Sequence, residues 1–313
     1  MIGIDVGGAN LKVADGQGVH IHYCPLWTGA PISDLLRPYA AAADHNEPAA
    51  VVMSGELADC FENKLQGIGF IADAVRKVFP KARFYGTDAT FHDGAVPVLA
   101  AANWLVSADF LREKYPDAVL LDIGSTTADI IPLSRFSDLL GLTDLARLQK
   151  GYLVYTGMLR TPVATLLSSV NLGRITTPVS TEYFAASADA HLVLGHIAPV
   201  EYTCDTPDHK EKTPEASLRR LARVVCADLE EIGEEGAREI AGAFWERQKE
   251  IVCGAVRRVQ DETGVSSVIV AGLGTSLFAR ELCGTDLNRA LGPVADALPA
   301  YAVREVALRK HGK

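Results

Sequence analysis

The sequence predicts an α/β protein of two domains, and three observations support this prediction. Apolar runs of strand length alternate with amphipathic stretches of helical spacing. The length of 313 residues suits two domains of roughly 100–200 residues each. A pattern of strand, aspartate, glycine turn and strand opens the chain at 1–15 and returns at 117–133. Such an internal repeat indicates two related halves, which we place at 1–115 and 116–313.

The first domain is predicted to begin with a three-stranded meander. Apolar and polar residues alternate in its second and third strands, and the turn chemistry of ADGQG separates these two strands. AAVVMSG has the apolar run of a buried strand, and IGFIADAVRKVF spaces its apolar residues as a helix does. The expected strands are 1–6, 10–15, 18–24, 49–55 and 82–86, and the expected helices are 31–43, 68–79 and 97–115.

The second domain repeats the opening pattern and later adds a further strand, glycine turn and helix. DAVLLDIGSTTADIIPL at 117–133 gives two strands around a glycine turn, and SSVIVAGLGTSLFARELC at 266–283 gives the late strand, turn and helix. Thr213 and Pro214 have the residue types of an N-cap and a first helical position. Helices are therefore expected from Pro214 to about 231 and over about 235–262.

Two segments of the second domain lack a clear period. Residues 150–205 carry several Thr, Pro and Gly residues, and we expect an irregular insertion that shapes a substrate pocket. The polar stretch DTPDHKEKTP at 205–214 is expected to be a mobile loop.

Composition and charge exclude several classes of function. A net charge of −9 gives no electrostatic footprint for nucleic acid. No apolar run reaches the roughly 18 residues that span a bilayer, and the first residues lack a charged-then-apolar signal. The six cysteines match no metal spacing, which predicts buried thiols in a reducing compartment. We therefore expect a cytoplasmic protein that acts on small molecules without nucleic acid or membrane, and we leave open a homo-oligomer.

The two repeated turns have the composition of phosphate-binding loops. Successive backbone N–H groups can point into one concavity when no Cβ obstructs them. Two carboxylates beside phosphates would repel them unless a divalent ion intervenes, so Asp5 and Asp122 imply Mg²⁺ held through waters; the alternative is that each caps a hairpin turn. The predicted phosphate-binding residues of the turns are Gly7, Gly8, Asn10, Gly124, Ser125, Thr126 and Thr127.

This arrangement resembles the superfamily of actin, sugar kinases and Hsp70. Residues 5–12 and 122–129 are similar to its two phosphate loops, and VAGLGTS, around 270–275, is similar to its adenosine loop. The resemblance implies a two-domain actin-like ATPase fold, also called ribonuclease H-like, with a duplicated meander. DIGSTTAD is most similar to the hydantoinase/oxoprolinase branch, although Asn10 and Lys12 stand where that branch usually has Thr and Asp.

Four longer stretches resemble one family of similar length in tetrahydromethanopterin-linked one-carbon metabolism. They are DVGGANLK, YLVYTGMLRTPV, EYFAASADAHLVLG and KTPEASLRRLARVVCADL. The resemblance implies a role in methanofuran biosynthesis. The family's reaction condenses an aminomethyl-furanmethanol diphosphate with the phenolic amine γ-glutamyltyramine, which forms an aryl ether and releases diphosphate. It also implies that the phosphate loops hold this diphosphate instead of ATP or ADP, as a Mg²⁺-dependent transferase would require.

On this basis four charged residues are assigned to catalysis. Asp5 and Asp122 would hold the metal. Lys12 can reach a phosphate, or it is an exposed strand lysine. Asp129 can act as base or metal helper, or it is a solvated strand residue.

Further residues are candidate substrate ligands, each with a structural alternative. Arg160, with Thr161, can bind an anion or begin a helix with a salt bridge. Tyr155, like Tyr152, can stack on a substrate ring or serve in packing. Lys210, with Lys212, can close over phosphates or belong to a solvated loop.

Gly272 and Gly274 are further candidate ligands of the substrate or its phosphates, whereas Asp189 and His191 are expected to be structural. Gly272 and Gly274 would hold another part of the substrate or be relics of a nucleotide fold, and their GLG pattern departs from the doubled glycine of ATP users. Asp189 is expected to cap a helix, and His191 is expected to be a core or surface histidine.

Two other functions compete with the transferase. An ATP-dependent small-molecule kinase or an oxoprolinase-type hydrolase would use all three loops, with Asp88 or Asp93 as the base of a kinase. A non-enzymatic regulator on the same fold is the second alternative, although a DNA-binding helix pair has no room before a loop that begins at Asp5.

Overall fold

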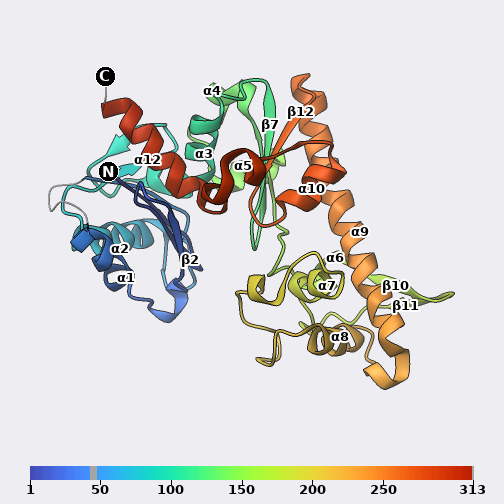
Figure 1. Ribbon diagram of the computed structural model, residues 1–313. Coiled ribbons are helices and arrows are strands. Elements are labelled where there is room, and N and C mark those ends of the chain that lie inside the picture. Colours follow the sequence, from blue (N-terminus) through green and yellow to red (C-terminus); the bar gives the residue numbers. More distant parts are fainter. Residues whose placement is uncertain (43–47, 312–313) are drawn as a thin grey trace.

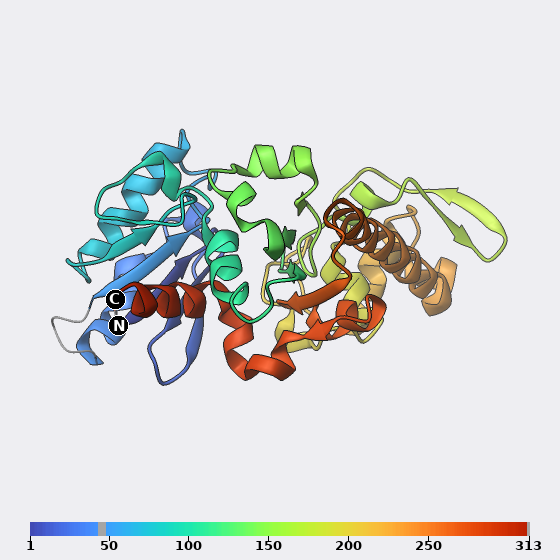
Figure 2. The same ribbon diagram turned by 90° about the horizontal axis from the view of Figure 1, so that it is seen from above.

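The computed structural model of the protein describes residues 1–42 and 48–311. Two mixed sheets lie side by side, with helices between them and on their outer faces, and a helical lobe extends from the second sheet (Figures 1 and 2). The first sheet has the order β3-β2-β1-β4-β5-β6 and the second β13-β12-β7-β8-β9, with a separate hairpin of β10 and β11. The strands are β1 (Ile2–Val6), β2 (Asn10–Ala14), β3 (Val19–Tyr23), β4 (Ala49–Met53), β5 (Arg83–Tyr85), β6 (Phe91–His92), β7 (Ala118–Ile123), β8 (Ala128–Pro132), β9 (Leu153–Val154), β10 (Ser169–Leu172), β11 (Ile175–Pro178), β12 (Ser267–Ala271) and β13 (Thr285–Asp286).

The two sheets share one topology. In the first, β1 pairs antiparallel with β2 and parallel with β4. In the second, β7 pairs antiparallel with β8 and parallel with β12. The register sets Asp5 opposite Lys12 and Asp122 opposite Asp129. The predicted duplicated meander of the ribonuclease H-like fold is therefore confirmed, whereas the domain limits 1–115 and 116–313 stay a prediction.

The helices follow the predicted order with differences at their ends. Helix α2 begins four residues earlier than predicted because the Asn63 side chain accepts a hydrogen bond from the Gln66 backbone N–H. The last residue of the predicted helix 31–43 lies outside the described residues. The helices are α1 (Ile32–Ala42), α2 (Lys64–Arg76), α3 (Asn103–Leu111), α4 (Phe136–Leu139), α5 (Asp144–Lys150), α6 (Val163–Leu166), α7 (Ser187–Val193), α8 (Pro214–Arg223), α9 (Leu229–Thr263), α10 (Thr275–Glu281), α11 (Leu287–Leu291) and α12 (Leu298–His311).

The single helix expected at 97–115 is wrong. Pro97 begins a short 3₁₀ turn, and the chain then breaks at Ala101, whose φ is +48°. The Ala102 backbone N–H donates to the Met53 carbonyl at the end of β4. This long-range bond fixes the break, and α3 starts only at Asn103.

Three further expectations need correction. Helix α8 ends at Arg223, well before 231, and Cys226 then has a φ of +59°. Helix α9 begins at Leu229, earlier than 235, and bends at Gly233, whose backbone is not helical. The segment 150–205 is more regular than expected, because it contains α6, α7 and the β10–β11 hairpin.

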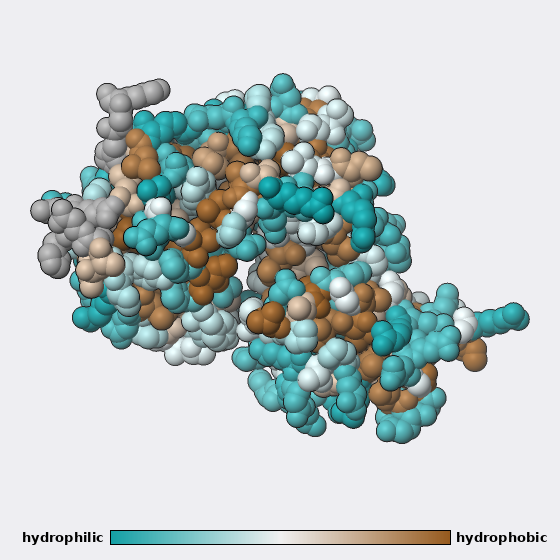
Figure 3. All heavy atoms as spheres, in the orientation of Figure 1, coloured by the Kyte–Doolittle hydropathy of each residue, from teal (hydrophilic) through white to brown (hydrophobic). Residues whose placement is uncertain are grey.

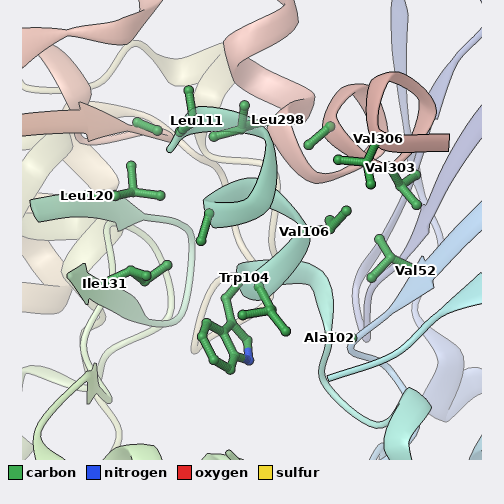
Figure 4. Packing of buried hydrophobic residues seen from close by; sticks show 14 of the residues in the cluster. Val52, Ala102, Trp104, Val106, Leu111, Leu120, Ile131, Leu298, Val303 and Val306 are labelled. Atoms are coloured by element: carbon green, nitrogen blue, oxygen red, sulfur yellow. The ribbon is translucent and has the colours of Figure 1, made fainter. Parts of the chain in front are cut away.

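Helices α3 and α12 lie between the two sheets and share one core with both (Figure 4). This core joins Val52 of the first sheet, Leu120 and Ile131 of the second, and Val106 and Val303 of the two helices. Close packing of this kind resists displacement of its parts. The two sheets are thus held at one relative placement by helices that lie about 190 residues apart in the sequence.

The outer faces are covered separately. Helices α1 and α2 cover the first sheet, and α9 and α10 cover the second. Helices α6, α7 and α8 form the lobe with the N-terminal part of α9. All six cysteines are free; Cys24 and Cys253 are buried, but Cys60, Cys226 and Cys283 are exposed, so buried thiols were predicted correctly for only some. Over residues 1–42 and 48–311, no helix is long and apolar enough to cross a membrane.

The contact of α12 with β1 depends on Gly3. A Cβ at this position would lie 2.1 Å from the Ala300 carbonyl oxygen and 2.7 Å from Arg304 Cβ. Gly3→Ala must therefore move α12, and we expect a loss of about 1–3 kcal/mol in the free energy of unfolding, measured in urea. The matched control is Gly242→Ala in α9, where a Cβ meets nothing within 4 Å and helix propensity favours Ala by about 1 kcal/mol. Equal stabilities of the two variants would contradict this packing.

Candidate active site between the two sheets

A cavity of about 300 Å³ lies where the carboxyl ends of β1 and β7 face each other. Ligands of α/β sheets bind at such strand ends. Figure 3 shows the groove that separates the lobe from the body of the first sheet. Thirteen predicted site residues line the cavity: Asp5, Gly7, Gly8, Asn10, Lys12, Asp122, Gly124, Ser125, Thr126, Thr127, Asp129, Tyr155 and Arg160. Other lining residues include Ser54, Asn103, Asp144 and Arg147, which the sequence did not indicate.

The first loop is held by the segment that follows β3. The Gly8 carbonyl accepts from the Leu26 N–H at 2.9 Å, and the Ala9 carbonyl accepts from the Cys24 N–H at 2.8 Å. In a trans peptide the N–H points opposite to the C=O. The N–H groups of Ala9 and Asn10 therefore point away from this supporting segment, as an anion site requires.

The second loop is held in the same way by residues 158–160. The Gly124 carbonyl accepts from the Met158 N–H, and the Ser125 carbonyl accepts from the N–H groups of Leu159 and Arg160, at 2.9 to 3.0 Å. By the same geometry the N–H groups of Ser125 and Thr126 point away from this segment. Both loops thus line one cavity with backbone N–H groups that are turned away from their supporting segments.

A buried polar network fixes this second supporting segment. The Gln248 side-chain amide donates to Thr156 Oγ1 and to the Gly157 carbonyl, both at 2.9 Å. The Thr161 hydroxyl accepts from the Gly157 N–H at 2.9 Å. Gly157 must be glycine, since a Cβ would lie 2.5 Å from the Thr126 nitrogen. Thr161 therefore positions the loop, in place of the anion contact considered from the sequence.

The loop glycines are explained by space and not by backbone conformation. None of Gly7, Gly8 and Gly124 has a positive φ. A Cβ on Gly8 would meet nothing within 4 Å, and one on Gly124 would meet only the Thr127 carbonyl at 3.9 Å. The open side of both residues is the cavity, so the absent side chains leave room for a ligand.

Asp5 and Asp122 lie in an environment that disfavours their ionised forms. Burial raises the pKa of Asp5 to about 6, and the nearby Lys12 partly offsets this. Burial and the neighbouring Asp129 raise the pKa of Asp122 to about 6, again against Lys12. Asp5 is only 3% exposed, and its Oδ1 has no hydrogen-bond partner among the described residues. Unpaired buried carboxylate oxygens are costly, unless a cation occupies the cavity.

Arg147 is a charged residue of the site that the sequence did not indicate, as is Asp144, which it contacts. Its guanidinium donates to Asp129 and, at 2.9 Å, to Asp144. Its Cζ lies 4.2 Å from the ring centroid of Trp104, a residue of the shared core. Burial raises the pKa of Asp129, and Arg147 opposes this shift. Asp129 is therefore the partner of a buried cation, whereas its predicted role as base or metal helper stays a prediction.

The cavity carries more negative than positive charge. Its carboxylates are Asp5, Asp122, Asp129 and Asp144, and its cations are Lys12, Arg147 and Arg160. Arg147 is already paired with two carboxylates. Over residues 1–42 and 48–311, neither Lys12 nor Arg160 forms an ion pair. These two cations remain available for an anionic ligand.

The guanidinium of Arg160 lies over an aromatic ring, with its Cζ 5.2 Å from the ring centroid of Trp27.

The two tyrosine candidates, Tyr155 and Tyr152, differ in their position relative to the cavity. Tyr155 lines the cavity and is 69% exposed, which does not fit the packing alternative. Tyr152 instead packs against core residues and does not line the cavity.

Gly272 and Gly274 lie behind the site. A Cβ on Gly272, whose φ is +85°, would lie 2.4 Å from the Ile123 carbonyl and 2.7 Å from Asp122 Oδ1. A Cβ on Gly274 would lie 2.6 Å from Ile123 Cγ2. The glycine turn therefore permits close packing on the end of β7, and neither glycine lines the cavity.

Lys210 is exposed and does not line the cavity either. Its loop is anchored, because Asp208 accepts from Arg220 at 3.0 Å and from Arg223 at 3.2 Å. Arg220 is fully buried and also binds Asp189 at 2.8 Å. This anchoring argues against the mobile loop that we expected at 205–214.

Asp189 and His191 have structural roles. The Asp189 carboxylate accepts from the Ala186 N–H and so caps α7, as predicted. His191 is buried and bonded to Gln248 at 2.8 Å, and burial lowers its pKa to about 3. A neutral core histidine of this kind was the favoured interpretation.

The residues present fit a magnesium ion held largely through water. Over the described ranges, no three His, Cys, Asp or Glu side chains gather as a metal cluster. Mg²⁺ commonly binds one or two carboxylates and completes its sphere with waters and substrate phosphates. Asp5 and Asp122 supply two such carboxylates, and the unpartnered Asp5 Oδ1 is an oxygen ligand that such an ion would satisfy.

Comparisons with known proteins place the chain among enzymes of one family. A model of the hydantoinase/oxoprolinase family matches residues 47–303. A (4-{4-[2-(gamma-L-glutamylamino)ethyl]phenoxymethyl}furan-2-yl)methanamine synthase from Methanocaldococcus jannaschii is 36% identical over 290 residues, which cover 89% of this chain and 87% of that protein. A synthase of the same name from Methanococcus vannielii is 36% identical over 172 residues, or 55% of this chain and 78% of that protein.

Two solved structures with a similar fold are a hexokinase and a component of a dehydratase. A ROK hexokinase from Thermus thermophilus has a TM-score of 0.44 and 13% identity, with 97% of each chain covered. Component A of the (R)-2-hydroxyglutaryl-CoA dehydratase from Acidaminococcus fermentans has a TM-score of 0.41 and 13% identity, with 98% of each chain covered.

The raised pKa of Asp5 predicts a stability cost of its negative charge. The native state binds this proton more tightly than the unfolded state, so the free energy of unfolding should fall as pH rises from about 4 to about 6. At pH 7.5 without divalent ions, Asp5→Asn should raise the free energy of unfolding by about 1–3 kcal/mol. This follows from the rise of the Asp5 pKa from 3.8 to about 6. Thermal and urea unfolding across this pH range measure the effect.

The matched control for this charge effect is Asp93→Asn. The Asp93 side chain is 83% exposed, and its removal should change stability by less than about 0.5 kcal/mol. A variant Asp5→Asn that is less stable than the unaltered protein at pH 7.5 would contradict a disfavoured buried charge.

Proposed function

This chain belongs to the hydantoinase/oxoprolinase family, in the branch of the (4-{4-[2-(gamma-L-glutamylamino)ethyl]phenoxymethyl}furan-2-yl)methanamine synthases, and from this membership and its site we propose that it is a synthase of the same aryl ether. Its place is then methanofuran biosynthesis and one-carbon metabolism. The substrates are small molecules: an aminomethyl-furanmethanol diphosphate and γ-glutamyltyramine. The reaction class is alkyl transfer to a phenol with diphosphate as leaving group.

The chemistry is a displacement at the furfuryl carbon. The bond between this carbon and the diphosphate oxygen breaks, and its electron pair leaves on the diphosphate. The bond between the phenol oxygen and the same carbon forms, and the phenolic proton goes to a base or to water. The furan ring can share positive charge on the carbon, so the main demand on the protein is to stabilise the negative charge of the leaving group.

The observation that carries this proposal is the pair of facing phosphate loops. Ala9, Asn10, Ser125 and Thr126 line one cavity, and their N–H groups point away from the segments that support the loops. A diphosphate has two phosphate groups, and each loop can bind one. The loops are fixed by hydrogen bonds to their supporting segments, so these donors require little reorganisation as charge develops.

Asp5 and Asp122 would hold Mg²⁺ beside the diphosphate. When bound, the ion supplies positive charge to the leaving group. Without it, a ligand with several negative charges would enter a cavity where carboxylates outnumber cations. The charge of Lys12 acts on both aspartates and opposes the rise of their pKa values. Its ammonium group can also donate to a phosphate oxygen.

Arg147 and Asp129 position the site in this proposal. Their ion pair is buried against Trp104, and loss of one partner from a buried pair leaves the other charge uncompensated. The pair joins α5 to β8, directly beside the second phosphate loop. It thereby fixes the wall of the cavity next to Asp122, its neighbour across the strands.

The competing function is an ATP-dependent kinase or hydrolase that uses the same loops for the phosphates of a nucleotide. The glycines that resemble an adenosine loop pack against β7 and do not line the cavity. This placement supports a ligand held by the two phosphate loops alone. A cytoplasmic location and a homo-oligomer stay predictions.

The first test is an assay by mass spectrometry without nucleotide. We expect ether and diphosphate from the two substrates with Mg²⁺, and loss of turnover when a chelator removes the ion. Asp5→Asn and Asp122→Asn should each lower kcat by about 100-fold or more, because they lose metal-mediated stabilisation of the leaving group. Full Mg²⁺-dependent turnover in both variants would refute the metal assignment. ADP formed from ATP without any ether would favour the kinase or hydrolase.

A second test separates the role of Lys12 from a general effect of its charge. Lys12→Met should lower kcat about 10–100-fold with little change in the KM of the phenol, since the lysine is assigned to the leaving group. Lys12→Arg, which keeps the charge, should recover part of the rate. A rise in the KM of the phenol without any loss of kcat would assign Lys12 to the acceptor and contradict this role.

A further inference from the structure

A second cavity adjoins the phosphate-loop cavity, and we propose that it binds the phenolic acceptor, with the ring among Tyr23, Trp27 and Tyr183 and the ammonium group of its tail at Asp205. This inference rests on the proposed function, because it assigns the second substrate of that reaction. The cavity has a volume of about 280 Å³ and shares only Ala9 and Arg160 with the first.

The position of this cavity follows from the segments that support the phosphate loops. Tyr23 and Trp27 flank Cys24 and Leu26, whose N–H groups hold the first loop. Arg160 donates its own N–H to the second loop. The walls of the second cavity are therefore fixed to the same backbone that orients the phosphate donors. A phenol oxygen at the border near Ala9 would face the carbon that carries the diphosphate, as displacement requires.

The aromatic lining has no role in a core. Tyr23 and Tyr183 are each 49% exposed, and Trp27 is 40% exposed. They come from two separate parts of the chain, residues 23–27 and Tyr183, and line one cavity. Burial raises the pKa of Tyr23 and of Tyr183, so both remain neutral at the pH of the assay. Half-exposed aromatic residues around a concave site are typical of a site for an aromatic ligand.

Charges of both signs line the second cavity. Arg160 stands at the border with the diphosphate site, and Asp205 stands on the loop that begins beyond Cys204. Over residues 1–42 and 48–311, Asp205 forms no ion pair. The Asp205 carboxylate in this lining can take the ammonium group of the glutamyl tail. The loop is a firm wall, since its Asp208 is bound to Arg220 and Arg223.

Calorimetric binding of two phenols tests the assignment without turnover. The probes are γ-glutamyltyramine and N-acetyltyramine, which keeps the phenol and the amide but lacks the charged tail. We expect Trp27→Leu and Tyr183→Leu to weaken both probes about tenfold. Asp205→Asn should weaken γ-glutamyltyramine about tenfold and leave N-acetyltyramine unchanged. Binding of inorganic diphosphate with Mg²⁺ should stay the same in all three variants.

The matched control is Phe70→Leu, an aromatic side chain that is 45% exposed on α2 and lines neither cavity. It should bind both probes as the unaltered protein does. Unchanged binding in Trp27→Leu and Tyr183→Leu, with ether still formed by the unaltered protein, would overturn this inference and leave the proposed function intact. The expected binding losses without any ether from the unaltered protein would support the phenol site and overturn the proposed function. Equal loss of both probes in Asp205→Asn would overturn the assignment of the tail.

Discussion

The site depends on the packing of α3 and α12 between the two sheets. Each sheet supplies one of the two glycine loops, and the proposed diphosphate would need both. The shared core of these helices determines the distance between the loops, because both sheets contribute side chains to it. Gly3 allows α12 to approach β1 closely enough for this packing. Trp104 belongs to the same core, and the guanidinium of Arg147 lies over its ring. The core therefore also supports the charged wall of the cavity.

The core raises the free energy of unfolding, whereas the buried charges of the cavity lower it. Asp5 and Asp122 are kept where burial disfavours their ionised forms, and a protein selected for stability alone would have apolar or amide side chains there. Arg147 neutralises carboxylates nearby but is oriented toward Asp129 and Asp144. The unfavourable charge at Asp5 and Asp122 therefore remains for a ligand to relieve, which is a common property of binding sites.

Local patterns predicted the parts of the site that lie within a few residues of each other. The aspartates and the glycine turns were found because strand, Asp and Gly follow directly in the chain. Arg147 was not found, since its helix meets Asp129 only after the chain has folded over eighteen residues. Trp27 escaped notice for the same reason. The break at Ala101 depends on a bond to Met53, which the apolar spacing of 97–115 does not contain.

The fold alone does not determine which phosphorylated ligand the two loops would hold. A backbone N–H recognises phosphate oxygens and not the group attached to them, so a nucleotide and a furfuryl diphosphate satisfy the loops equally. Selectivity must come from what borders them. On one side the glycine turn at Gly272 is packed against Asp122 and Ile123; on the other, Arg160 opens onto a cavity walled by Tyr23 and Trp27. A cavity with aromatic walls beside the proposed leaving-group site is suited to joining two ring systems, and the segments that line this cavity are hydrogen-bonded to both phosphate loops.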